Sequence, residues 1–135
     1  MLQPNRTKFR KHQKGGKKGV RSNTTKLEFG RCGLKALESG RVEAKTIEAV
    51  RRVMTRRFKR SGQIWIRIFP DIVITTKPSQ VRMGKGKGGI SHWVCRVQPG
   101  QILYEITGVS SPLIKQAATL ASHKLGIKVG LIDAD

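Results

Sequence analysis

Residues 82–89 (RMGKGKGG) contain Gly84, Gly86 and Gly89 in the spacing G-x-G-x-x-G, which occurs in loops that bind dinucleotides or ATP. A dinucleotide loop follows a strand and opens into a helix at its last glycine. Here a strand is expected after the glycines, at residues 92–97, and the aspartate motifs that a kinase needs later in the chain are missing. The spacing therefore does not indicate nucleotide binding.

The same segment is typical of a flexible hairpin loop that carries cations. Its glycines allow the backbone to approach a phosphate chain closely, and Arg82, Lys85 and Lys87 supply positive charge. We expect this loop to reach into RNA. The alternative is an exposed, mobile turn whose charges are incidental.

Six further cations gather at the end of a predicted helix: Arg51, Arg52, Arg56, Arg57, Lys59 and Arg60. Like charges three or four residues apart destabilise a helix by roughly 0.2–0.5 kcal/mol per pair unless anions neutralise them. Only Glu43 and Glu48 offset these six. This density favours a surface that contacts phosphates over a merely solvated helix face.

Residues suited to catalysis or to metal binding are scattered along the chain. His12, His92 and His123 have no evident partner for acid–base or nucleophilic chemistry, and no two carboxylates have a spacing that implies a shared site. Cys32 and Cys95 lack a CxxC partner, so buried thiols are favoured over a zinc site. We therefore expect no catalytic residue, no metal and no cofactor.

The charge of the chain is strongly positive and unevenly distributed. It has 28 Lys and Arg against 8 Asp and Glu, a formal net charge of +20 over 135 residues, which predicts a polyanionic partner. The first 21 residues hold eight basic and no acidic side chains. We expect this self-repelling block to be disordered until it lies against phosphates; a solubilising tail is the alternative. No apolar run of about 18 residues exists, so no membrane partner is expected.

The elements that position these residues follow from hydrophobic periodicity. Apolar residues at helical spacing predict helices at residues 43–58 and 111–126. Alternating patterns predict strands at residues 63–69, 72–76, 92–97, 102–107 and 128–132, and a weaker one within 26–37. Residues 98–101 (QPGQ) have turn chemistry, so the strands on either side should pair as a hairpin. Trp65 and Trp93 could stack on bases, but alternation favours the core.

These elements predict an α+β fold with a largely antiparallel β-sheet packed with two α-helices. We expect one α+β domain over residues 26–135, which includes the glycine-rich loop, preceded by a basic extension over residues 1–25. Ser111 and Pro112 are the expected start of the second helix, and Gly126 is its expected end.

Three long stretches carry a family resemblance: MLQPNRTKFRKHQKG (residues 1–15), TIEAVRRVMTRRFKRSGQIWIRIFPD (46–71) and VRMGKGKGGISHWVCRVQPGQILYEITGV (81–109). Together they resemble large-subunit ribosomal protein sixteen of bacteria and organelles. The resemblance implies a structural constituent of the large ribosomal subunit that binds large-subunit rRNA and helps to position A-site tRNA near the peptidyl-transferase centre. Neighbouring large-subunit proteins and the P-site tRNA are further expected partners, and a homo-oligomer is not expected.

Carried over residue by residue, the resemblance assigns rRNA contacts to residues of the tail and the first helix: Arg6, Lys8, Arg10, Lys11, Lys14, Lys17, Lys18, Arg51, Arg52, Arg56, Arg57 and Arg60. It assigns a tRNA-facing position to loop residues Arg82, Met83, Gly84, Lys85, Gly86 and Lys87. In some bacterial members the loop arginine is hydroxylated, and Arg82 is the matching residue.

Residues 18–26 and the C-terminal GLIDAD differ from the bacterial pattern, whereas RRFKRSGQIW and QAATLASHKL are more similar to plant or protist mitochondrial members. A mitochondrial ribosome is therefore favoured over a bacterial or plastid one. A general nucleic-acid protein, such as a DNA compactor, is the competing function, since the charge alone permits it. The glycine–lysine loop and the short chain argue against it, and the scattered acids and histidines argue against an enzyme acting on nucleic acid.

Overall fold

A computed structural model describes residues 1–16 and 24–134. In this part of the chain the elements are β1 (Cys32–Ala36), β2 (Gly40–Glu43), α1 (Ala44–Arg57), β3 (Gln63–Ile66), β4 (Ile72–Thr76), β5 (Gly89–Val97), β6 (Ile102–Thr107), α2 (Ser111–Leu125) and β7 (Val129–Asp133). Every strand pair is antiparallel. The predicted α+β class is confirmed, although the strands divide between two sheets, ordered β3-β6-β1-β7 and β2-β5-β4.

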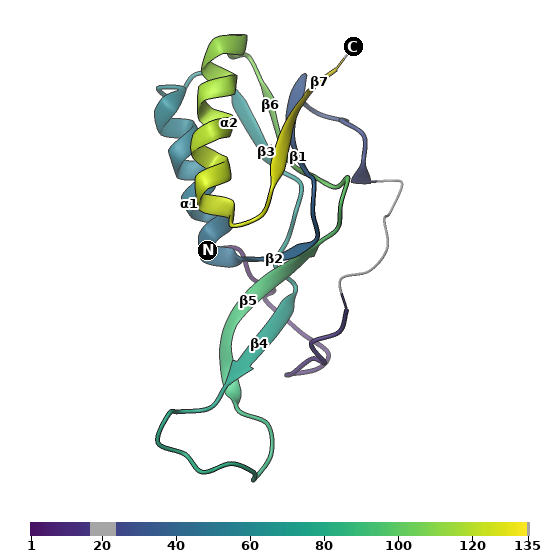
Figure 1. The fold of residues 1–135 in the computed structure, drawn as a ribbon, viewed down its shortest axis with the longest axis vertical. Coiled ribbons are helices and arrows are strands. Elements are labelled where there is room, and N and C mark those ends of the chain that lie inside the picture. Colours follow the sequence, from purple (N-terminus) through teal and green to yellow (C-terminus); the bar gives the residue numbers. More distant parts are fainter. Residues whose placement is uncertain (17–23, 135) are drawn as a thin grey trace.

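Both helices pack on one face of the four-stranded sheet and against each other (Figure 1). Tyr104 of β6 is fully buried in this core, and its hydroxyl donates to the carbonyl of Ile47 in α1 at 3.0 Å. Leu34 of β1 is also fully buried. In β1 the alternate residues Cys32, Leu34 and Ala36 belong to this core, as expected for a strand whose successive residues point to opposite faces.

The two predicted helices are confirmed. Ile47, Val50 and Met54 of α1 are buried at the expected helical spacing. The second helix has a proline in its first turn and ends at Gly126, whose left-handed backbone (φ 69°) is the usual glycine helix stop. Its N-cap is Ser110, one residue before the predicted cap.

The opposite face of the four-stranded sheet is covered in part by residues 27–30. Glu105 of β6 is fully buried there, and its carboxylate accepts backbone N–H bonds from Glu28 at 3.2 Å and from Phe29 and Gly30 at 2.6 Å. It also pairs with Arg67. Burial raises the pKa of Glu105, but these amides and Arg67 together bring it below its ordinary value. A buried carboxylate is tolerated because it is fully hydrogen-bonded, and it fixes the segment.

The three-stranded sheet extends away from the helices (Figure 1). Its strands β4 and β5 form a hairpin that pairs Ile72 with Val94 at the near end and Thr76 with Gly89 at the far end. Residues 77–88 form the loop that closes it. The predicted cation-carrying loop therefore lies at the tip of this projection.

The predicted hairpin between residues 92–97 and 102–107 is wrong. β5 pairs with β2 and β4, whereas β6 pairs with β1 and β3, so the chain changes sheets at residues 98–101. The N–H of Gly100 donates to the carbonyl of Ala36 at 2.7 Å, and the N–H of Ala36 donates to the carbonyl of Gln101 at 2.8 Å. The end of β1 therefore bonds to residues 98–101, and the chain after this turn continues in the four-stranded sheet instead of pairing with β5.

Strand boundaries also differ from the prediction. Within residues 26–37 only Cys32–Ala36 is a strand, because the amides just before it bond to Glu105. The strand predicted at 63–69 ends at Ile66. β2 was not predicted, and its last residue, Glu43, is the N-cap of α1 rather than a helical residue.

The two tryptophans are not core residues, contrary to expectation. Both are only partly buried. Trp65 stacks on Phe29, with ring centroids 6.1 Å apart and planes inclined by 22°. Trp93 meets the ring of His12 edge-on at 6.5 Å. Each tryptophan therefore lies under a segment that precedes the domain core in the chain.

Candidate nucleic-acid interface

The loop at the tip of the β4–β5 hairpin presents every residue that was assigned a tRNA-facing position. All six are exposed, and Met83 is 94% exposed. One bond spans the loop, from the Lys77 ammonium to the carbonyl of Gly84. The exposed backbone and side chains of residues 82–86 can approach a phosphate chain closely.

The backbone at the loop tip explains its glycines. Gly84, Lys85 and Gly86 all have left-handed backbones, with φ of 93°, 58° and 87°. A Cβ at either of these glycines would meet nothing within 4 Å, so the backbone conformation rather than crowding favours glycine. Lys85 adopts the same conformation without that freedom, and this places a cation at the apex of the turn.

The described part of the N-terminal tail lies along this hairpin instead of extending freely (Figure 1). Lys87 of the loop donates to the carbonyl of His12 at 2.5 Å, and Lys11 donates to the carbonyl of Lys87 at 3.3 Å. The N–H of Val73 donates to Nδ1 of His12 at 3.4 Å. Residues 1–16 have no helix or strand, yet these contacts give them a defined place beside the loop.

Two arginines that sequence reasoning missed hold the next part of the tail. Arg41 of β2 and Arg96 of β5 are directly opposite in the sheet register. Both donate to the carbonyl of Lys14, at 3.4 and 2.8 Å, and Arg41 also donates to that of Gly15 at 2.8 Å. Like charges opposite each other destabilise a sheet, and the tail carbonyls offset this repulsion. Arg41 and Arg96 are neighbours because of how β2 and β5 align in the sheet, and the pattern of a single sequence does not reveal that alignment.

The tail residues assigned to rRNA divide into two groups. Five of them are exposed along or before the contacts with the hairpin: Arg6, Lys8, Arg10, Lys11 and Lys14. The ammonium of Lys8 lies 5.8 Å from the ring centroid of Phe9. Lys17 and Lys18 lie outside the described residues.

A second cationic region forms where α1 ends. A surface hollow is lined there by Arg51, Arg52, Thr55, Arg56, Lys59 and Arg60. Lys59 and Arg60 follow the helix with left-handed backbones, φ 52° and 64°, which are unfavourable for residues with a Cβ. In the described structure Arg56, Lys59 and Arg60 form no ion pair, so this hollow is suited to an anion.

The other arginines of α1 are partly occupied. Glu48 bonds to Arg51 at 2.9 Å and to Arg52 at 3.1 Å, and the hydrogen bond from Arg51 holds the pKa of Glu48 at about 2. Arg57 points elsewhere, because its Nε donates to Gln116 of α2 at 2.9 Å. The predicted basic face is therefore smaller than the sequence suggested, and Arg57 does not line the hollow.

These two cationic regions lie far apart. α1 begins beside β2, near the base of the hairpin, and runs away from it, so its end and the hairpin loop occupy opposite ends of the molecule (Figure 1). The structure joins the tail to the loop and leaves the end of α1 as a separate cationic surface.

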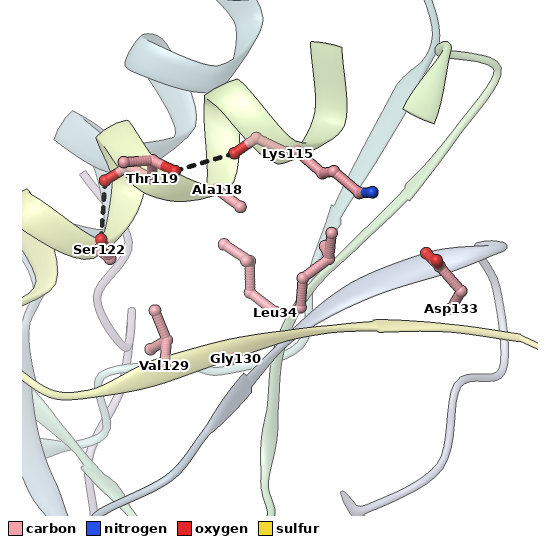
Figure 2. Close-up of a pocket in the computed structure, with 9 residues that line it drawn as sticks. Leu34, Lys115, Ala118, Thr119, Ser122, Val129, Gly130 and Asp133 are labelled. Carbon is pink, nitrogen blue, oxygen red and sulfur yellow. Dashed lines mark hydrogen bonds between the residues drawn. The ribbon is translucent and has the colours of Figure 1, made fainter. Parts of the chain in front are cut away.

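The hollow between α2 and β7 has no comparable charge (Figure 2). Its lining includes Leu34, Ala118 and Val129, with Lys115 and Asp133 toward one end. The hydroxyls of Thr119 and Ser122 donate to carbonyls of the helix itself, at 3.1 and 2.7 Å, so they are already engaged. This lining offers no arrangement for acid–base or nucleophilic chemistry.

The histidines and acids of the described residues form no metal cluster. Nε2 of His92 lies 3.8 Å from Glu43, His12 is bonded to β4, and His123 is exposed in the last turn of α2. Among the helices of this part of the chain, none has the length and apolar character needed to cross a membrane.

This α+β domain has two separate cationic surfaces, one formed by the tail with the hairpin loop and one at the end of α1, and in class it is a structural protein suited to a polyanion. The family model for ribosomal protein L16p/L10e matches residues 4–132, and the chain belongs to this family. The predicted resemblance is therefore confirmed. Membership also confirms the expectation of a ribosomal structural protein that takes part in translation and is not an enzyme.

Similar proteins come from an organelle and from bacteria. The chain is 58% identical to large ribosomal subunit protein uL16m of Prototheca wickerhamii over 132 residues, which is 98% of each chain. It is 52% identical to protein uL16 of Allorhizobium ampelinum and 53% identical to that of Psychrobacter arcticus, in each case over 98% of this chain and 96% of the relative. The similarity therefore extends through tail, hairpin and both helices.

Proposed function

We propose that this chain is a constituent of the large ribosomal subunit that binds large-subunit rRNA and helps to position A-site tRNA near the peptidyl-transferase centre. The β4–β5 hairpin is the observation that carries the proposal. It holds an exposed loop with Lys85 at its apex well away from the helices, and the tail lies beside it. A projection of this kind reaches into RNA while the rest of the domain stays outside.

The chemistry of rRNA binding rests on the tail and on the hollow at the end of α1. Cations that contact phosphates fix the orientation of a protein on nucleic acid and supply most of its sequence-independent affinity. Two separated surfaces fit a folded RNA better than a single groove of DNA, since they can meet phosphates of different helices. Of the assigned residues of α1 and its end, Arg56 and Arg60 are the best suited, because both line the hollow and neither has an ion-pair partner within the described structure.

The partners follow from this role. The chain acts as a single copy beside neighbouring large-subunit proteins, with the P-site tRNA as a second candidate for contact by the loop. The 58% identical relative named uL16m supports a mitochondrial ribosome as the compartment. Co-purification of a tagged chain with mitochondrial rather than cytoplasmic or plastid ribosomes tests this assignment.

Sedimentation of a tagged chain through a sucrose gradient tests the core of the proposal. The chain should comigrate with the large subunit and the monosome at moderate salt. Migration with DNA, or as free protein at every salt concentration, would contradict the proposal.

The loop is tested separately with the double variant Arg82→Gln, Lys85→Gln. It should still sediment with the large subunit, because the tail and α1 are intact, but its ribosomes should bind A-site tRNA more weakly. The matched control is Lys115→Gln, Lys124→Gln, which removes the same charge from α2. Equal A-site affinity in both variants would count against a tRNA-facing loop.

A further inference from the structure

An exposed aromatic ring lies on the face of the four-stranded sheet that the helices do not cover. Phe29 is 57% exposed, and its ring stacks on that of Trp65 in β3, with centroids 6.1 Å apart. The guanidinium carbon of Arg67 lies 5.3 Å from the centroid of the same ring. Trp65 and Arg67 are alternate residues on one side of the chain, so both contact Phe29 from the sheet, while more than half of Phe29 remains exposed to solvent.

The backbone that carries this ring is rigidly held. Glu105 accepts the N–H bonds of residues 28–30, and the chain is pressed against β6. A Cβ on Gly30 would lie 2.7 Å from the backbone nitrogen of Ile106, so no larger residue fits there. A ring presented by such a fixed segment loses little conformational freedom when a ligand stacks on it, and that favours binding.

The surroundings favour a nucleic-acid base as the ligand. Stacked aromatic rings with a nearby guanidinium are a common platform for unpaired bases. Exposed cations stand close in the chain, at Lys26 and Arg31, whereas the carboxylate of Glu28 lies 3.8 Å from Arg67 and is partly neutralised. The chain as a whole carries a net charge of +20, which attracts a polyanion to this face.

The platform is also continuous with the second cationic region. β3 is an edge strand of the four-stranded sheet, and no other strand among residues 1–16 and 24–134 pairs with its outer side. Its first residue, Gln63, lines a hollow together with Arg51 and Arg60 of the α1 end. A strand rises about 3.3 Å per residue, so Trp65 lies only about 7 Å along the strand from Gln63. One RNA strand can therefore contact both the cations and the ring.

We propose that Phe29, supported by Trp65, stacks on an unpaired base of large-subunit rRNA while phosphates of the same strand lie at the end of α1. This inference rests on the proposed rRNA binding and adds a base-contacting site to its phosphate contacts. The sequence did not assign Phe29 or Arg67 to RNA, and it favoured a core position for Trp65 over base stacking.

The test uses the full chain bound to a transcript of large-subunit rRNA. Short-wave ultraviolet irradiation followed by mass spectrometry of the original chain should give a nucleotide adduct on Phe29. Phe29→Leu keeps an apolar side chain but removes the aromatic face, so affinity should fall about fivefold to a hundredfold. The salt dependence should stay unchanged because no charge is lost. Phe29→Tyr should bind like the original chain.

Phe69→Leu is the matched control, since Phe69 is 46% exposed and has no ring contact in the described structure. It should leave affinity unchanged, and circular dichroism should be the same for all variants. If the original chain binds the transcript without an adduct at Phe29, and Phe29→Leu binds equally well, base stacking is wrong while rRNA binding stands.

Two other outcomes overturn the inference for different reasons. If the original chain does not bind the transcript at all, the proposed function fails and the base-stacking site fails with it. If Phe29→Leu binds the transcript normally but enters the large subunit poorly, the open face of the ring contacts a protein rather than a base.

Discussion

The hairpin end and the helical end of this molecule are held together by different forces. At the helical end, Tyr104, Leu34 and Ile47 are fully buried, and apolar burial stabilises the packing of the helices on the sheet. At the hairpin end, the tail is attached largely by lysine and arginine side chains that donate to backbone carbonyls. Exposed bonds of this kind contribute little net stability, so changes to the tail should alter binding more than folding.

The largest stability loss should follow from Glu105→Ala, at the helical end. It leaves Arg67 and the amides of residues 28–30 buried without their acceptor. Breaking a buried pair of this type costs about 3–5 kcal/mol, measured as the free energy of unfolding in urea. The control is Glu28→Gln, at a residue whose side chain is 56% exposed, and it should cost less than about 1 kcal/mol. If both variants lost the same free energy of unfolding, Glu105 would not stabilise the attachment of residues 28–30 to the sheet.

Removal of residues 2–16, at the hairpin end, should weaken rRNA binding and leave the fold intact. The circular dichroism spectrum should stay unchanged, because only Leu2 of this segment packs on the core. Affinity for large-subunit rRNA should fall, and the slope of log affinity against log salt should decrease by roughly 0.7–0.9 for each cation that contacted a phosphate. If the truncated chain lost its folded state instead, the tail would be part of the core, and the proposed difference between the forces at the two ends would be wrong.

A smaller effect on stability is expected at the end of α1, where the cation Arg60 lies at the helical end of the molecule. Arg60 has a φ of 64°, so Arg60→Gly should relieve an unfavourable backbone and stabilise the chain by about 1 kcal/mol in urea unfolding. The same change removes a cation from the hollow and should weaken rRNA binding.

Arg56→Gly provides the matched control for this variant. It removes the same charge from the same hollow but puts glycine into a helix, which should destabilise the chain by about 1 kcal/mol. Binding should fall in both variants while stability moves in opposite directions. If Arg60→Gly bound rRNA normally, the cation of Arg60 would make no contribution to binding, and the contact proposed for it would be wrong.

Local patterns were sufficient for the helices and for the loop. The spacing of Ile47, Val50 and Met54 is a property of one segment, and so is the glycine-rich tip with Lys85. The family resemblance was also readable, because it is distributed over most of the chain. These features need no knowledge of which strands pair.

The division into two sheets could not be predicted, because it depends on bonds between distant residues. The turn at Gly100 has hairpin chemistry, yet its bonds run to Ala36 of β1. Likewise, Arg41 and Arg96 are paired by register, and their joint hold on the tail has no signal in either segment. One signal was available for Glu105, since a single acid within the apolar strand Ile102–Thr107 must be either paired or exposed.

The route of the chain between the sheets has a mechanical consequence. The chain passes between the four-stranded and the three-stranded sheet four times: from β1 to β2, from β2 through α1 to β3, from β3 to β4, and from β5 to β6. A projection attached by one connection would be free to rotate about that connection. The three-stranded sheet is held by four connections, and β5 runs from its base toward the tip of the hairpin, so a force applied at Lys85 is transmitted to the body of the domain.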